Sequence, residues 1–423
     1  MNSNSKYRSP ESLLMLGFCV YAVLSLVSMA LMSIGAGILF LTGLVLILKF
    51  PTFRRQLVPL WQTKEIRTFL LLSSGFAGAL LISLVAAYFF PVHVAGAIPE
   101  VHFLSDSLKL WYLFWPAMIA IGLTLIPRSQ FQKVLFFWIS AAVALSILGI
   151  VQYFTGWPRQ QMILFSQPPR YHATLFIGHH LSVASVLIFP FFTCLDLAVQ
   201  KCKIANRLIL VIAALLIATA LFLTYSRTLW MALPIGVVFW GAIQLSRKGA
   251  VALFIVMLLS IAGASQIPKV QEKFKNSEGI ASRIELWKAN IDFFEMRPLT
   301  GVGFRKNGDL SGPYLQEKLN LSHVFAGHAH NNALDFLAAT GLLGFLGWVV
   351  WSLGIAWIAW RTKKSNPNFN LFSALIAAWI VFQINGLTQV NFWDGKVLHT
   401  TMFTIGLALY LSIREKVQSE NGH

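Results

Sequence analysis

Residues 208–224 have the sequence LILVIAALLIATALFLT, and after the short connection YSRT at 225–228 a second apolar run, LWMALPIGVVFWGAIQL, follows at 229–245. Neither run contains Lys, Arg, Asp or Glu. Runs of this length are typical of helices that cross a bilayer, because a helix satisfies every backbone polar group inside its own segment. The pair therefore predicts two antiparallel membrane helices joined by a tight turn.

The composition of the whole chain points the same way. Of its 423 residues, 57% are apolar and 12% are charged, whereas soluble domains are roughly 45–50% apolar and about 25% charged. These values exclude a soluble enzyme, a disordered protein, a coiled coil and a nucleic-acid-binding module. Continuous rather than alternating apolar runs exclude an outer-membrane barrel. We expect an all-α polytopic integral membrane protein with the lipid bilayer as a partner and no nucleic acid.

The apolar runs predict about twelve transmembrane helices, the first two separated by a turn around Ser33. They also divide the chain into spans 1–9 (1–266), a long periplasmic loop segment with short helices (267–330), and spans 10–12 with a cytoplasmic tail (331–423). The runs lie at 12–31, 33–50, 68–89, 110–126, 134–154, 180–199, 208–224, 229–245, 249–266, 331–360, 369–388 and 397–413.

The net charge of +17 is best explained as a topology signal. If the N-terminus lies in the cytoplasm, most of the 33 Lys and Arg residues fall on cytoplasmic segments, as the positive-inside rule requires. Both termini are then cytoplasmic, and segment 267–330 faces outward. Lys6 and Arg8 precede the first run without a cleavage site, so we expect an uncleaved first span. The short outward loops keep only Lys109, Arg159, Arg170, Arg227 and Lys396.

Within the long segment, Ser282-Arg283-Ile284-Glu285 fits a capping box and predicts a helix that starts at Ser282. Pro298, Gly301 and Gly303 end it. Apolar residues at helical spacing predict one apolar face, so this helix should lie on the membrane surface or pack over the spans. That face comprises Ile284, Trp287, Ile291 and Phe294.

Three arginines on the outward side are candidates for a polyanion site. An arginine close to the membrane either forms an ion pair, has a function, or extends its guanidinium group to the membrane interface. For a single arginine these explanations are equally good. Three on one face, namely Arg170, Arg227 and Arg283, favour a functional site. Guanidinium groups bind phosphate oxygens in bidentate fashion.

The second candidate is His330, in the stretch His328-Ala329-His330-Asn331-Asn332 directly before the tenth span. Helix N-termini favour anions, and a neutral imidazole can accept a proton from a hydroxyl nucleophile. Asp335 lies five residues further on, a spacing that a helix does not bring together well. A metal held by His328 and His330 lacks nearby carboxylates at ligand spacing, so we expect neither a metal nor a cofactor. The chain has no Walker loop and no Asp-x-Asp pair, which favours a lipid-linked diphosphate as the substrate.

These motifs resemble the O-antigen ligase family, whose superfamily includes O-antigen polymerases and protein O-oligosaccharyltransferases. The family pattern of His-Asn, nine residues, Gly, two residues and Gly is met by His330-Asn331 and Gly341-Leu342-Leu343-Gly344. Thr224-Tyr225-Ser226-Arg227 and Arg283-Ile284-Glu285-Leu286-Trp287 resemble further family segments. Gly178-His179-His180 resembles an earlier periplasmic stretch.

The resemblance implies a metal-independent, inverting glycosyltransferase of the bacterial inner membrane with its active site facing the periplasm. It would transfer O-antigen from an undecaprenyl-diphosphate-linked donor to a sugar hydroxyl of lipid A–core. A polymerase or a protein O-oligosaccharyltransferase with the same donor is the alternative, and a non-enzymatic glycolipid transporter is a further one. His330 would act as base or position the acceptor, and Arg227 and Arg283 would hold the leaving group. Candidate substrate-binding residues are Arg170, Asn331, Tyr225, His328 and His180.

Overall fold

The computed structural model describes residues 9–158, 163–166, 168–200, 203–275, 278–362 and 371–420. The described residues form an almost wholly helical bundle, and their one sheet is the antiparallel hairpin of β1 (Ile163–Ser166) and β2 (Pro169–Tyr171). Lys6 and Arg8, on which the prediction of an uncleaved first span rests, lie outside the described residues, and so does Arg159. The first helices are α1 (Pro10–Leu24), α2 (Met29–Lys49), α3 (Pro51–Gln62), α4 (Lys64–Phe89), α5 (Phe103–Leu108), the 3₁₀ helix η1 (Lys109–Leu113), α6 (Trp115–Thr124) and α7 (Arg128–Thr155).

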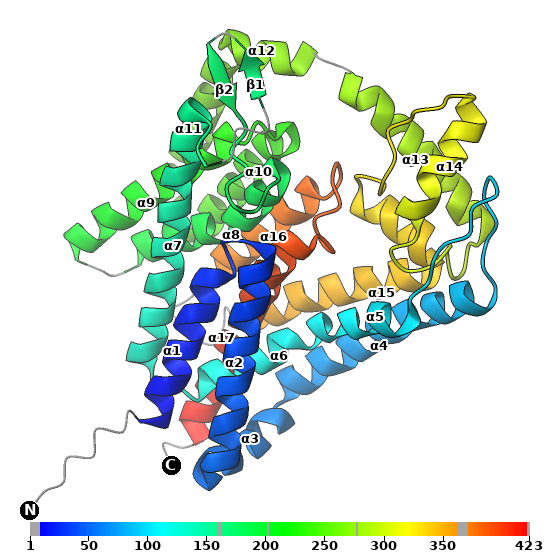
Figure 1. Cartoon of the computed structure of the whole chain (residues 1–423). Coiled ribbons are helices and arrows are strands. Elements are labelled where there is room, and N and C mark those ends of the chain that lie inside the picture. Colours follow the sequence, from blue (N-terminus) through cyan, green and yellow to red (C-terminus); the bar gives the residue numbers. More distant parts are fainter. Residues whose placement is uncertain are drawn as a thin grey trace, which may run out of the picture.

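The remaining helices complete the bundle and the outward segment (Figure 1). They are α8 (His180–Val199), α9 (Ile204–Leu223), α10 (Arg227–Gln244), α11 (Arg247–Ser265), α12 (Pro268–Lys275), α13 (Glu278–Met296), α14 (Asn307–Leu319), α15 (Asn332–Thr362), α16 (Phe372–Asn385) and α17 (Gly395–Glu420).

Each of the twelve predicted apolar runs coincides with helix. Among the described residues, 9 helices are long and apolar enough to cross a membrane, and α1 and α16 are shorter apolar helices. The remaining run corresponds to α10. The chain is therefore an all-α, multi-pass membrane protein, as predicted.

One predicted boundary is wrong. The first two helices are separated at residues 25–28 rather than at Ser33, because the Ser28 hydroxyl accepts a hydrogen bond from the Leu31 amide (3.4 Å) and caps α2. Ser33 lies inside α2. There its hydroxyl donates to the Met29 carbonyl instead of terminating the helix.

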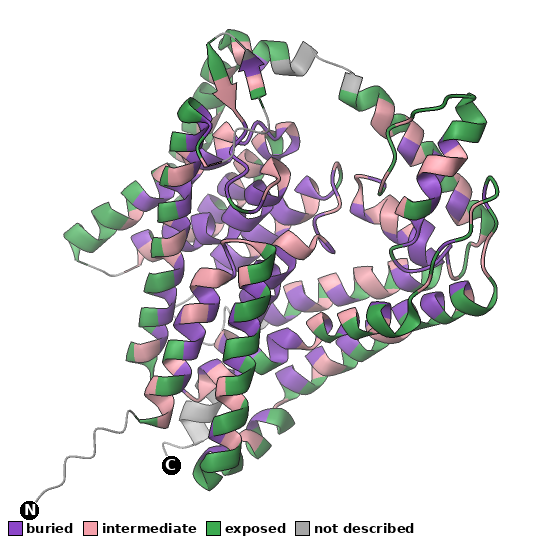
Figure 2. Cartoon of the chain, viewed as in Figure 1, coloured by how far each residue is buried: buried purple, intermediate pink, exposed green. Residues whose placement is uncertain are grey.

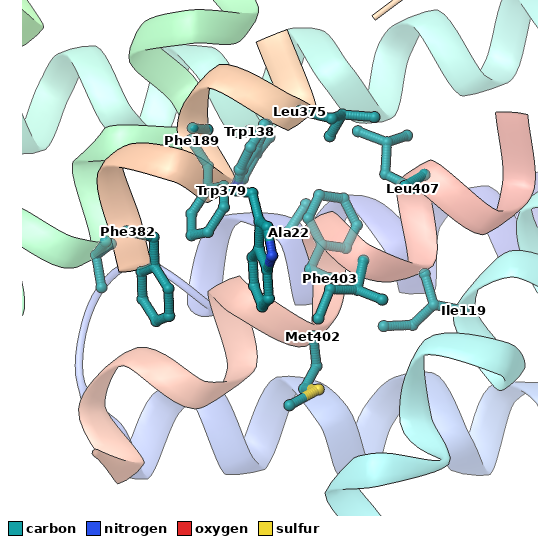
Figure 3. Close-up of a cluster of buried hydrophobic side chains, with 14 of the residues drawn as sticks. Ala22, Ile119, Trp138, Phe189, Leu375, Trp379, Phe382, Met402, Phe403 and Leu407 are labelled. Carbon is teal, nitrogen blue, oxygen red and sulfur yellow. The ribbon is translucent and has the colours of Figure 1, made fainter. Parts of the chain in front are cut away.

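The core lies around α8 and α17. Their apolar windows are 83% and 94% buried, whereas that of α11 is 0% buried, so α8 and α17 are central spans and α11 faces lipid. Figure 2 shows the buried centre and the exposed periphery. Large rings fill the centre, where Trp138 of α7, Phe189 of α8, Trp379 of α16 and Phe403 of α17 lie together (Figure 3).

The outward segment forms a small helical module, α13 with α14, that packs on the first half of α15 (Figure 1). Its core contains Leu286 and Phe293 of α13, Leu310 of α14 and Ala338 of α15. The predicted helix start at Ser282 is wrong, because α13 begins at Glu278.

The predicted apolar face of α13 differs from the face that packs on α14 and α15. Ile284 and Ile291 are 41% and 44% exposed, because the helix turns Leu286, Ala289 and Phe293 toward α14 and α15 instead. The helix does pack over a span, α15, as one of the two predicted arrangements required.

A break in α15 holds this module in place. Gly341 has φ 63° and ψ −164°, which interrupts the helix. The turn after α13 pairs with the freed backbone. The Val302 amide donates a hydrogen bond to the Ala338 carbonyl, and the Gly303 amide donates one to the Ala339 carbonyl, both at 2.9 Å. In return, the Leu342 amide donates to the Pro298 carbonyl at 2.8 Å.

Only glycine fits at this crossing. A Cβ at Gly341 would overlap the backbone of Leu299 and Thr300, and one at Gly301 (φ 65°) would overlap the backbone of Ala339 and Thr340. Gly341 is the first glycine of the His-Asn-x9-Gly pattern. The pattern therefore joins the histidine to the fixed point on which the outward module rests.

Replacing Gly341 with alanine should destabilise the protein strongly. Backbone overlap and a positive φ act together, and each of these effects is worth roughly 1–3 kcal/mol. Thermal unfolding of the purified protein in detergent would measure the loss. The matched control is Gly37→Ala, because Gly37 lies in α2 with nothing within 4 Å of its added Cβ. An equal melting temperature for the two variants would contradict this account of the crossing.

Candidate functional site

Arg227 is the first residue of α10, and a sharp turn directs it outward. Tyr225 has φ 53°, which breaks the chain between α9 and α10. Its ring stacks on Tyr153 (centroids 6.0 Å apart) and its hydroxyl lies 3.3 Å from the Tyr153 hydroxyl. At 5% exposure, Tyr225 is packed into the turn. Its part in the site is to fix the start of α10 and thereby the position of Arg227.

Arg283, which is half-buried in the first turns of α13, lies within electrostatic reach of Arg227. Burial lowers the pKa of Arg283 below its usual value, and the charge of Arg227 lowers it further. Two guanidinium groups from segments 56 residues apart in the chain thus act on each other electrostatically. Like charges at short range in a partly buried site repel, so this arrangement favours a bound anion.

His330 lies directly before α15 in a left-handed conformation with φ 48°. Its ring stacks on Phe325 (5.7 Å) and meets the His328 ring edge-on (4.3 Å). Burial, then the charges of His328, Arg283 and His179, lower the pKa of His330 to about 3. The imidazole is therefore neutral at physiological pH, with a pKa lower than the near-neutral one expected of a general base. Among the described residues, its buried Nδ1 has no hydrogen-bond partner.

Asp335 fixes the backbone of this turn rather than the imidazole. Its Oδ1 accepts a hydrogen bond from the Ala329 amide (3.3 Å) and another from Asn307 Nδ2 on α14 (2.7 Å). Asn331 caps α15, because its Oδ1 accepts from the Ala333 amide at 2.9 Å. These contacts set the left-handed conformation of His330 and link it to the outward module.

The histidines at the start of α8 border the same site. The His180 ring, at the first residue of α8, stacks on His172 (4.1 Å) and lies 5.0 Å from the His179 ring. Burial lowers the pKa of His179 and the charge of Lys396 adds to this; Asp394 opposes the shift, and His328 and Arg283 contribute less. His179 and Lys396 were not among the predicted site residues.

Arg170 lies with the aromatic residues of the turn. Its guanidinium lies over the Phe154 ring (5.1 Å) and the Tyr153 ring (5.8 Å), and Nη1 donates to the Pro169 carbonyl at 2.8 Å. No contact among the described residues joins it to Arg283 or His330. Of the three arginines predicted to converge, Arg227 and Arg283 act on each other electrostatically, while Arg170 acts on Tyr225; their common role in a site stays a prediction.

The loop 386–394 ties four helix starts together, and sequence reasoning missed it. The Asn332 amide of α15 donates to the Gly386 carbonyl (2.8 Å), and its side chain donates to Asn391 Oδ1 (2.6 Å). Thr388 bonds Thr228 of α10.

Asp394, at the end of this loop, accepts from Ser182 of α8 and from the Lys396 amide of α17 (3.0 Å). The only sequence signal was the polar stretch Asn391-Phe392-Trp393-Asp394 in an outward loop. The positive ends of four helix dipoles, from α8, α10, α15 and α17, thus lie around one network.

The geometry defines a class: a multi-pass membrane protein with paired arginines and a neutral histidine at helix starts, able to bind a polyanion and to accept a proton. Residues 212–349 match the model of the O-antigen ligase family. That stretch contains Arg227, Arg283 and the His330 motif, so the resemblance found in the sequence is confirmed over these residues, and the match supports an O-antigen ligase or polymerase type of function in general. No curated protein matches the chain.

The low pKa of His330 predicts a pH-dependent stability. Below about pH 6.5 the unfolded chain binds a proton at this imidazole that the folded chain refuses down to about pH 3. The folded state therefore loses stability as the pH falls, by up to about 2 kcal/mol at pH 5.

His330→Asn removes the imidazole and keeps a residue that tolerates positive φ. Thermal unfolding in detergent at pH 7.5 and pH 5 should show a smaller drop for this variant than for the wild type. If both lose the same stability, the imidazole is not shielded from protons.

Proposed function

We propose that the protein is an O-antigen ligase, which transfers a glycan from an undecaprenyl-diphosphate-linked donor to a sugar hydroxyl of lipid A–core. The observation that supports this most is the electrostatic coupling of Arg283 to both Arg227 and the neutral His330. Two cations suit the two phosphates of the donor. A neutral imidazole suits an acceptor hydroxyl that must lose its proton.

The reaction is a single displacement. The acceptor oxygen attacks the anomeric carbon, the bond from that carbon to the diphosphate oxygen breaks, and the diphosphate leaves with the electron pair. Attack from the opposite face inverts the anomeric centre. Arg227 and Arg283 neutralise the charge that develops on the leaving group, so the step requires neither metal nor cofactor. The proton of the acceptor passes to the His330 imidazole.

The bound donor makes His330 a better base. In the structure, surrounding positive charge holds the pKa of His330 low. A diphosphate between Arg227 and Arg283 offsets that charge, so the pKa of the imidazole rises when the donor is in place. Base strength and donor binding are thus coupled.

The other predicted substrate-binding residues have supporting parts. Tyr225 and Asn331 hold Arg227 and His330 in position through the contacts described above. His328 and His180 border the anion site, and Arg170 lies beside the turn where the donor glycan would emerge.

We further propose that the site faces the periplasm of the bacterial inner membrane, with both termini in the cytoplasm. The charge bias of the loops supports this orientation. It leaves 267–330 as the periplasmic segment between two groups of spans, 1–266 and 331–423.

Deletion of the gene in the host bacterium should abolish long lipopolysaccharide ladders while undecaprenyl-linked polymer remains. Gel analysis of lipopolysaccharide with lipid extraction would measure both. Lipopolysaccharide with a single repeat would identify a polymerase instead. Normal lipopolysaccharide with unglycosylated pilin would identify an oligosaccharyltransferase, and donor trapped on the cytoplasmic leaflet would identify a transporter.

Arg227→Lys should lower transfer strongly, because lysine keeps the charge and loses the bidentate geometry. His330→Asn should lower transfer by about 10²–10⁴-fold, the usual contribution of general-base catalysis. Transfer by purified protein in detergent, with and without chelator, would measure both, and chelator should have no effect. Lys288→Gln, on an exposed residue of α13, is the matched control. Wild-type rates in both site variants at normal protein levels would refute these roles.

A further inference from the structure

A groove opens on the outward module, away from the paired arginines. Its walls include Ser282, Ile284 and Glu285 of α13, Leu319 at the end of α14, and Leu321 and Phe325 in the loop that follows α14. Leu321 and Phe325 are 53% and 54% exposed. We call this the α13–α14 groove. The loop that forms one wall passes beside α13 in Figure 1.

The groove is continuous with the candidate active site through Phe325. One face of this ring stacks on His330, with the ring centroids 5.7 Å apart, and the same side chain lines the groove. The imidazole itself does not line the groove, so the Phe325 ring is the side chain that links the two.

Helical spacing separates the groove from the anion site. Ser282 and Glu285 are three residues apart and share one face of α13. Arg283 projects from a different side of the helix, within electrostatic reach of Arg227. One helix thus presents a cation to one ligand and a groove wall to another.

The chemistry of the groove suits an uncharged sugar and not a phosphate. No lysine or arginine lines it, His323 is its one basic side chain, and its one carboxylate is Glu285, which forms an ion pair with Lys288 at 2.7 Å. A second carboxylate lone pair and the Ser282 hydroxyl can bind sugar hydroxyls. The negative face of the Phe325 ring attracts the polarised C–H edges of a pyranose, and Leu321 and Leu319 cover its apolar surface.

We propose that the α13–α14 groove binds the acceptor as an uncharged terminal pyranose and directs its hydroxyl to His330. This rests on the proposed function and adds to it the substrate class of the second subsite. The donor diphosphate lies on the arginine side of α13, and the acceptor sugar lies on the groove side. Phe325 is then a residue that determines acceptor recognition.

The test measures binding without catalysis. Dephosphorylated core oligosaccharide is titrated calorimetrically into the full-length protein in detergent, for the wild type, Phe325→Ala, Phe325→Trp and the control Leu299→Ala. Leu299 is exposed in the same module and does not line the groove. Loss of one aromatic contact should weaken binding about three- to tenfold in Phe325→Ala, while Phe325→Trp and Leu299→Ala bind as the wild type does.

The same variants in the transfer assay separate this proposal from the proposed function. Phe325→Ala should raise the acceptor KM by a similar factor and leave the donor KM unchanged. Equal oligosaccharide binding by the wild type and Phe325→Ala would overturn the acceptor groove. The same conclusion would follow if the wild type bound no oligosaccharide and Phe325→Ala changed the oligomeric state of the protein. If oligosaccharide binding by the wild type depends on Phe325 but the wild type transfers no glycan, only the proposed function is refuted.

Discussion

The backbone exchange at Gly341 is the constraint on which the site depends. A helix broken inside a membrane protein leaves carbonyl and amide groups that require partners, and here the turn after α13 supplies them. The backbone groups that lose their helical hydrogen bonds at the break therefore bond the turn after α13 and so attach the outward module to α15. Arg283 enters on that module and His330 precedes the helix that breaks. The distance between them is set by one crossing of two backbones rather than by flexible loops.

Several cations lie at helix starts in the site. Four helices begin around loop 386–394, and Arg227, Arg283 and Lys396 lie near those starts. Cations at helix N-termini are unfavourable, and stability alone would place carboxylates there. The two carboxylates present are Asp394, which accepts hydrogen bonds from Ser182 and the Lys396 amide, and Asp335, which accepts them from the Ala329 amide and Asn307. An unfavourable arrangement that persists in a packed fold is typical of a site completed by its ligand.

The sequence predicted the helical class and the twelve runs, because apolar length and charge bias are properties of single segments. It failed where several segments act together. The buried face of α13 follows from contacts with α14 and α15, which outweigh the stripe that includes Ile284. Arg170 has the same residue type and sidedness as Arg227, but the rings of Tyr153 and Phe154 hold it elsewhere. Loop 386–394 has no motif, since its role is to join helix starts distant in sequence.

A low pKa at His330 and a role as base are compatible once the order of binding is considered. Before a donor binds, the imidazole is neutral but weakly basic, because burial, Arg283 and the neighbouring histidines disfavour its charged form. In the proposed mechanism the donor diphosphate would supply the opposite charge, so that proton transfer becomes favourable after the donor has entered. An acceptor hydroxyl that arrived first would meet a poor base. The two arginines proposed to hold the leaving group would therefore also prevent deprotonation before a glycan is available to receive the attack.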